Sequence, residues 1–219
     1  LAMLMDAGRH KPVLVMAEGS LVQRGRHYRP VLERLLRECG NVLGVAMGTS
    51  EAAGFVDKDM NITGWLNELA FVPVDAAPDA MRDEWSGDIG CGVKYFSQDG
   101  VIKLAPRAGI VLNGESPAEK LKEVQALMAQ DDPRAAAVYR GIGIYLGHTL
   151  ALYARFYDIR HVLMLGRVMS GKGGDIILEN ACRVLREEYP EINWRPEAPD
   201  EKARRVGQSV AAATLPEVK

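Results

Sequence analysis

Two glycine-rich stretches and one glutamate are the residues whose types and spacing could do chemistry. The first stretch, GVAMGTSEAAGFV at residues 44–56, joins two apolar runs through small side chains. Small residues leave main-chain amides open to an anion, so Gly48, Thr49 and Ser50 are candidates to contact a phosphate group. The alternative is a hairpin whose glycines serve only the tight turn, and spacing does not decide between the two.

The second stretch is GKGGD at residues 171–175, which follows an apolar strand and precedes a predicted helix. Ligand-binding loops gather at this position in α/β proteins, although the glycine spacing of a dinucleotide site is absent. A surface turn with Asp175 as helix N-cap is the competing interpretation. The sequence has no GxxxxGK[ST], which excludes a P-loop.

The glutamate is Glu68, which stands among apolar residues in WLNELAF. A carboxylate in a partly apolar site accepts hydrogen bonds from sugar hydroxyls, whereas the alternative is a solvated glutamate at a strand end. The four histidines lack HxxxH and HExxH spacing. Neither a metal site nor a Ser-His-Asp triad is therefore indicated.

Strands and helices that would position these residues alternate along the chain, which favours the α/β class. Strands are predicted over residues 13–16, 41–47, 55–56, 62–65 and 161–165, and helices over 28–39, 116–129, 132–157, 176–188 and 206–215. Ser116 and Glu119 predict a capping box, and residues 76–86 a surface loop. Gly141, Gly143 and Gly147 inside one helix indicate close approach by a ligand or by another helix, and both readings stay open.

Composition argues against several classes of binding partner and against a membrane or disulfide-rich protein. A net charge of -2 and the lack of a basic run argue against nucleic-acid and membrane-surface partners. Cys39, Cys91 and Cys182 lack CxxC spacing, which argues against a disulfide framework and fits a reducing cytoplasm. The apolar runs are too short for a membrane span, and the first residues are not typical of a signal peptide.

Five segments resemble, in order, the C-terminal lobe of ROK proteins, which are sugar kinases, glucokinase-like transferases and sugar-responsive repressors of the actin-like ATPase superfamily. The segments are NVLGVAMGTSEAAGFV, WLNELAFVPVD, GDIGCGVKYFSQDGV, YLGHTLALYARFYDIRHVLMLGRVMSG and GQSVAAA. The resemblance covers about residues 41–215 and divides the chain into a segment 1–40 and a ROK-like lobe 41–219. It implies a ribonuclease H-like, actin-like lobe with a mixed sheet flanked by helices.

The resemblance also implies roles for particular residues. Glu68, with Asn67, would contact the sugar. ATP would be contacted by the hairpin and by glycines near the adenosine: Gly48, Thr49, Ser50, Gly143, Gly147 and Gly166. The cofactors implied are ATP and Mg²⁺, and the pathway is carbohydrate metabolism.

Several positions depart from the ROK pattern. Phe71 stands where the sugar motif has its histidine, and Asn67 and Ala70 replace its two glycines. Arg167 replaces the second glycine of the adenosine element. The zinc motif is reduced to Gly90-Cys91, so no structural zinc is expected. The N-terminal phosphate loop and the Asn-Asp that supplies the catalytic aspartate are missing.

Residues 13–39 resemble instead a strand and helix near the C-terminal end of hexokinases, where Gly19 and Ser20 would border the nucleotide. That element would normally follow the glycine hairpin, whereas here it precedes the hairpin. Three explanations of this order remain open: a fusion, a permuted arrangement, or pieces of a longer protein joined in numbering. Glu18 is a candidate to replace the missing catalytic aspartate.

The function these features imply is ATP-dependent phosphorylation of a hexose. This chain would supply the C-terminal lobe and be inactive without an N-terminal lobe, and a homodimer is expected. The alternative is a sugar- or nucleotide-binding regulator of the same fold without kinase activity. In a third reading, the glycines of an α/β domain serve packing only.

Overall fold

The structure of the chain, a computed structural model, describes residues 41–59 and 68–199. The elements predicted over 13–16, 28–39, 62–65 and 206–215 lie outside these ranges. So do the candidate residues Glu18, Gly19, Ser20 and Asn67.

A four-stranded mixed sheet forms the centre of the fold and confirms the α/β class. Its strands lie in the order β2-β1-β3-β4, and β1 pairs with β2 antiparallel and with β3 parallel. β1 and β3 are buried almost throughout, as expected for strands that read as unbroken apolar runs. The strands are β1 (Val42–Met47), β2 (Glu51–Val56), β3 (His161–Leu165) and β4 (Pro196–Glu197).

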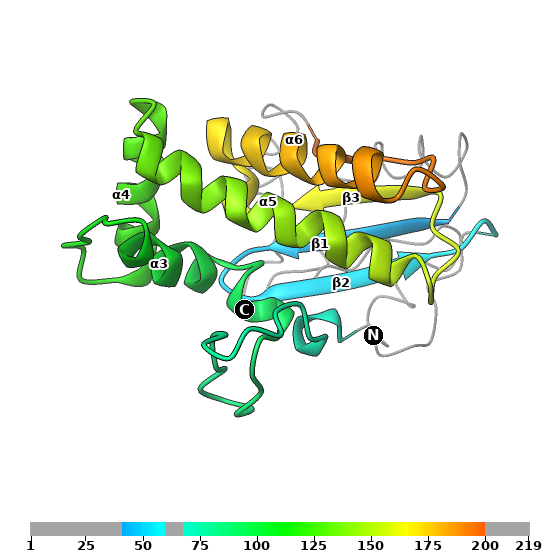
Figure 1. The fold of residues 1–219 in the computed structure, drawn as a ribbon, viewed down its shortest axis with the longest axis horizontal. Coiled ribbons are helices and arrows are strands. Elements are labelled where there is room, and N and C mark those ends of the chain that lie inside the picture. The colour runs from blue at the N-terminus through cyan, green and yellow to red at the C-terminus, as the bar shows by residue number, and fades with distance from the viewer. Residues whose placement is uncertain (1–40, 60–67, 200–219) are drawn as a thin grey trace, which may run out of the picture.

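Helices α5 and α6 run side by side across the sheet, with α3 and α4 grouped at one end of it (Figure 1). The predicted capping box of α4 is confirmed, because the Ser116 hydroxyl accepts a hydrogen bond from the Glu119 amide at 3.3 Å. The helices are α3 (Gln98–Arg107), α4 (Pro117–Ala129), α5 (Pro133–Tyr153) and α6 (Gly171–Glu188). Three short 3-10 helices are η1 (Leu69–Phe71), η2 (Gly92–Lys94) and η3 (Arg167–Met169).

The prediction of a loop at residues 171–175 is wrong, because these residues form the first turn of α6. Ser170 is the N-cap residue, and Asp175 lies inside the helix. A side chain at Gly173 would lie 2.6 Å from the Tyr139 ring, and one at Gly174 would collide with the Met169 carbonyl. Gly173 and Gly174 therefore allow the first turn of α6 to pack closely against its neighbours. Sequence reasoning also missed α3, whose polar first turn and late Pro106 hide its periodicity.

The three glycines of α5 have different surroundings. An added Cβ at Gly143 would lie 2.6 Å from the Ile177 carbonyl oxygen, and one at Gly147 would lie 2.6 Å from Val184 Cβ. Both glycines thus let α5 approach α6 closely. At Gly141 an added Cβ meets nothing within 4 Å.

Alanine substitutions should separate these roles. Gly147→Ala is expected to lower the free energy of unfolding by about 1–3 kcal/mol, because the methyl group overpacks the α5–α6 contact. Gly141→Ala, the matched control on the same helix, is expected to raise it by up to about 1 kcal/mol through helix propensity. Urea unfolding measures both. Equal effects of the two substitutions would contradict the packing role of Gly147.

Candidate functional site

The carboxyl ends of β1 and β3 meet at one edge of the sheet, because the two strands are parallel neighbours. The hairpin tip at residues 48–50 follows β1, and Gly166 follows β3. Gly166 has φ +98°, and a side chain there would collide with the Met47 main chain. The structure therefore brings Gly166 against the hairpin, at the edge where α/β proteins bind ligands.

The hairpin tip is anchored to the start of α3. The Gly48 amide donates to the Ser50 carbonyl at 3.0 Å, and the Gly48 carbonyl accepts from the Gln98 amide at 2.7 Å. Gly48 is buried, whereas Thr49 and Ser50 are exposed. A ligand at this edge would meet a turn of small residues whose conformation is fixed from behind.

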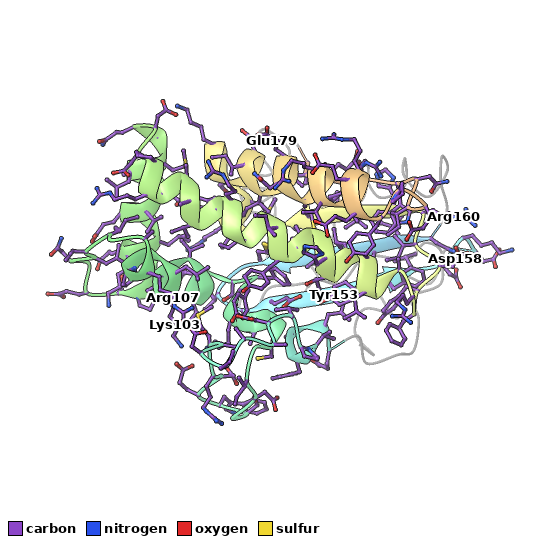
Figure 2. The ribbon with its side chains drawn as sticks, viewed as in Figure 1. Lys103, Arg107, Tyr153, Asp158, Arg160 and Glu179 are labelled. Atoms are coloured by element: carbon purple, nitrogen blue, oxygen red, sulfur yellow. The ribbon has the colours of Figure 1, made fainter. Side chains whose placement is uncertain are left out.

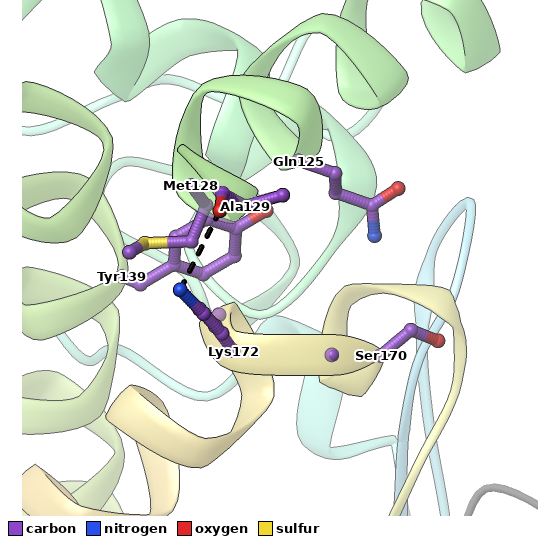
Figure 3. A pocket seen from close by; sticks show the side chains of 8 residues that line it. Gln125, Met128, Ala129, Tyr139, Ser170 and Lys172 are labelled. Atoms are coloured by element: carbon purple, nitrogen blue, oxygen red, sulfur yellow. Dashed lines mark hydrogen bonds between the residues drawn. The ribbon is translucent and has the colours of Figure 1, made fainter. Parts of the chain in front are cut away.

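A pocket of about 350 Å³ opens beside the N-terminus of α6, between α4 and α5 (Figure 3). Its apolar wall is made by the Tyr139 ring, Met128, Ala129 and Gly173, and its polar groups come from Gln125, Ser170 and Lys172. Main-chain amides at a helix N-terminus carry partial positive charge. The pocket therefore joins a small apolar wall, exposed at Ala129, to the N-terminus of α6, which favours an anion.

Two contacts fix the rim of this pocket. The Gln125 amide donates to the Arg167 carbonyl at 3.0 Å, which ties α4 to η3. Lys172 Nζ lies 2.7 Å from both carboxylate oxygens of Asp131. Asp131 has φ +59°, an unusual conformation for a residue other than glycine. It allows the chain to turn between α4 and α5 with the carboxylate facing Lys172.

Tyr139 forms the back of the pocket, where its ring lies behind Ala129 (Figure 3). The residue is fully buried, and its hydroxyl has no hydrogen-bond partner among the described residues. Burial raises the pKa of this phenol, so it stays neutral. No pattern in the sequence indicated this pocket, because its wall combines residues of three helices.

The other predicted residues lie away from this pocket. Gly143 and Gly147 face α6, and neither lines the pocket. Glu68 is exposed at the N-cap of η1, which packs beside β2. Phe71, which replaces the histidine of the ROK sugar motif, lies on the same short helix, with its ring centroid 5.9 Å from that of Trp85.

A buried carboxyl group that sequence reasoning missed follows the hairpin tip directly. Glu51 begins β2 and packs against Gly92 and the hydroxyl of Tyr153, which comes from the last turn of α5 (Figure 2). Burial raises the pKa of Glu51 to about 8, although the Tyr153 hydroxyl, 3.5 Å from Oε1, acts in the opposite direction. At neutral pH this group is therefore mainly the neutral acid.

Cys91, the cysteine of the reduced zinc motif, is buried. Within residues 41–59 and 68–199, no group of three or more His, Cys, Asp or Glu side chains is arranged to hold a metal ion. Among the helices of the same ranges, none is long and apolar enough to cross a membrane.

Comparison with known proteins places the fold. No protein-family model matches the sequence, and no curated protein sequence matches it either. The structure is similar to a ROK family glucokinase from Streptomyces griseus in complex with glucose and AMPPNP, with a TM-score of 0.57 and 23% identity. The alignment covers 80% of this chain and 60% of the glucokinase.

Two further solved structures give the same result. A ROK hexokinase from Thermus thermophilus aligns with a TM-score of 0.57 and 19% identity over 80% of this chain and 57% of the hexokinase. A ROK family transcriptional regulator, a homologue of the E. coli MLC protein, aligns with a TM-score of 0.59 and 18% identity over 81% of this chain and 46% of the regulator. The chain thus has the fold of ROK proteins, the actin-like ATPase fold, and spans about half to three fifths of their length.

Proposed function

We propose that the chain is the nucleotide-binding lobe of an ATP-dependent hexose kinase of the ROK type. The observation that carries the proposal is the pocket at the N-terminus of α6, on the edge of the sheet that also holds the glycine hairpin. The fold likeness to a glucokinase solved with AMPPNP and glucose supports it.

The pocket residues fit a nucleotide. The purine would lie against Ala129, in front of the buried Tyr139 ring, and the ribose near Gln125 and Lys172. The phosphates would extend along Gly166 toward Thr49 and Ser50, where main-chain amides favour an anion. When bound, Mg²⁺ neutralises phosphate charge. Phosphate oxygens would ligate the ion, since no group of three or more His, Cys, Asp or Glu side chains among the described residues is arranged to hold a metal.

Glu68 would hold the sugar by accepting hydrogen bonds from its hydroxyls. Transfer also needs a carboxylate that takes the proton of the attacking hydroxyl. Glu18, outside the described residues, remains the candidate the sequence offers. We expect the isolated chain to bind nucleotide weakly and to show no measurable turnover.

A second candidate is a sugar- or nucleotide-binding regulator without kinase activity. Phe71 in place of the motif histidine favours it, as does the fold likeness to a ROK transcriptional regulator. A coupled ADP-release assay with glucose separates the two, because only a kinase couples sugar to ADP formation.

Filling the pocket tests the nucleotide site. Ala129→Trp puts a large ring on the exposed rim of the pocket and is expected to weaken Mg-ATP binding at least about tenfold in isothermal titration. Ala137→Trp is the matched control, since Ala137 is exposed on α5 and does not line the pocket. Equal ATP affinity of the two variants would exclude this pocket as the site.

A further inference from the structure

A small hairpin at residues 81–90 displays the most exposed of the large hydrophobic side chains in the described part of the chain. Trp85 lies at its tip with 85% of its surface exposed. The hairpin is well bonded, with the Asp83 amide donating to the Asp88 carbonyl at 2.7 Å and the Gly90 amide to the Met81 carbonyl at 2.7 Å. Single exposed hydrophobic residues are common on protein surfaces, but this indole lies beside a second aromatic ring, that of Phe71. The two rings together form an aromatic surface that a ligand can contact.

Ion pairs fix the position of Trp85. The two residues before it, Asp83 and Glu84, both contact the buried Lys94, with nearest nitrogen–oxygen distances of 3.3 and 2.7 Å. Lys103 projects from α3 toward this hairpin and also pairs with Glu84 (Figure 2). The indole is therefore presented from a rigid base, which lowers the entropic cost of binding.

Phe71 extends the aromatic surface toward Glu68. The Phe71 and Trp85 rings are inclined at 37° with their centroids 5.9 Å apart. The Phe71 amide donates to the Glu68 carbonyl at 3.2 Å, which closes one 3-10 turn. Glu68 is the exposed N-cap residue of this turn, three positions before Phe71.

The chemistry of this surface selects a neutral ligand with one apolar face. Glu68 and Asp88 are exposed acidic residues, whereas Glu84 is paired with Lys94 and Lys103, and the Arg82 guanidinium of the same hairpin donates to the Gly87 carbonyl. The surface therefore carries no strong charge of either sign, which suits a neutral ligand. A pyranose ring presents axial C–H groups on its faces and hydroxyls at its rim. Its C–H groups carry partial positive charge, which suits the negative face of an aromatic ring.

We propose that Trp85 and Phe71 form a stacking surface for the apolar face of a pyranose whose hydroxyls bind Glu68. The inference rests on the proposed function and names the ligand class of its sugar site. A gluco-configured sugar fits best, because in its β-pyranose form all ring hydrogens are axial.

Sugar titrations of wild type and of four variants, one of them a control, test this assignment. Wild type, Trp85→Ala, Trp85→Phe and Glu68→Gln are titrated with D-glucose in the presence of Mg-AMPPNP, and indole NMR signals report contact with Trp85. Trp85→Ala is expected to weaken glucose binding on the order of tenfold, and Trp85→Phe to restore most of the affinity. Phe156→Ala is the matched control, since Phe156 is also exposed, at 70%, outside the hairpin.

The outcomes separate this inference from the proposed function. Glucose binding that Glu68→Gln weakens and Trp85→Ala leaves unchanged overturns the stacking surface and leaves the sugar site intact. Loss of self-association in Trp85→Ala with unchanged glucose affinity makes the surface a subunit interface and also overturns the proposal. Absence of any glucose binding by wild type overturns the proposed function, and the inference with it.

Discussion

Replacing Glu51 by glutamine is expected to remove a strong pH dependence of stability. The ordinary pKa of this carboxyl is 4.5, and burial raises it to about 8 in the folded chain. Between these values the folded chain holds a proton that the unfolded chain has released. Stability is therefore fully present below about pH 4.5 and falls as pH rises toward 8.

The expected size follows from about 1.4 kcal/mol per pH unit. From pH 5 to pH 8, wild type should lose about 4 kcal/mol relative to Glu51→Gln, because the amide has no proton to release. Urea unfolding at several pH values measures the difference. Glu68→Gln, which alters an exposed carboxylate, is the matched control in the same measurements.

Parallel stability curves for wild type and Glu51→Gln would show that the Glu51 carboxyl is ionised in the folded chain. Oε2 of this group has no hydrogen-bond partner among the described residues, and a charge there would lack compensation. The buried Glu51 carboxyl is therefore neutral in the folded chain, and its ionisation at alkaline pH destabilises the fold.

Replacing Lys94 by methionine is expected to lower the free energy of unfolding by about 3 kcal/mol. Lys94 Nζ contacts three carboxylates, those of Asp83, Glu84 and Asp99, while its side chain is only 5% exposed. Burial opposes its charge, but these hydrogen bonds outweigh burial and raise the pKa of Lys94. Methionine keeps the apolar stem and leaves the carboxylates facing one another.

Lys103→Met is the matched control, because Lys103 pairs with two of the same carboxylates from a side chain that is 31% exposed. Exposed ion pairs contribute little, so we expect a loss of at most about 1 kcal/mol. Circular dichroism checks that both variants fold, and urea unfolding gives the difference. Equal losses would contradict a central role for Lys94 in the cluster.

Local signals predicted much of the fold. The capping box of Ser116 and Glu119 fixes a helix start through contacts between residues three positions apart, and the structure confirms it. The hairpin at residues 44–56 was readable because small residues interrupt two apolar runs. Such features depend only on neighbouring residues.

The candidate site was harder to predict, because it depends on contacts between distant elements. The pocket combines α4, α5 and α6, and nothing in the sequence near Tyr139 or Gln125 marks them as neighbours. Glu51 reads as an ordinary polar residue beside a turn, and only the packing of α5 and η2 buries it. The start of α6 was missed because a run of glycines is typical of a loop, whereas here Gly173 and Gly174 allow close packing against Tyr139 and Met169.

The bond between the Gly48 carbonyl and the Gln98 amide has a consequence for how two ligands would communicate. Asp99, the next residue, pairs with Lys94 at 2.6 Å, and Lys94 in turn holds the residues before Trp85. These contacts form a continuous chain from the turn after β1, through the first turn of α3, to the hairpin that carries Trp85. If binding at one end changed affinity at the other, the change would be the same factor in both directions, as thermodynamic reciprocity demands.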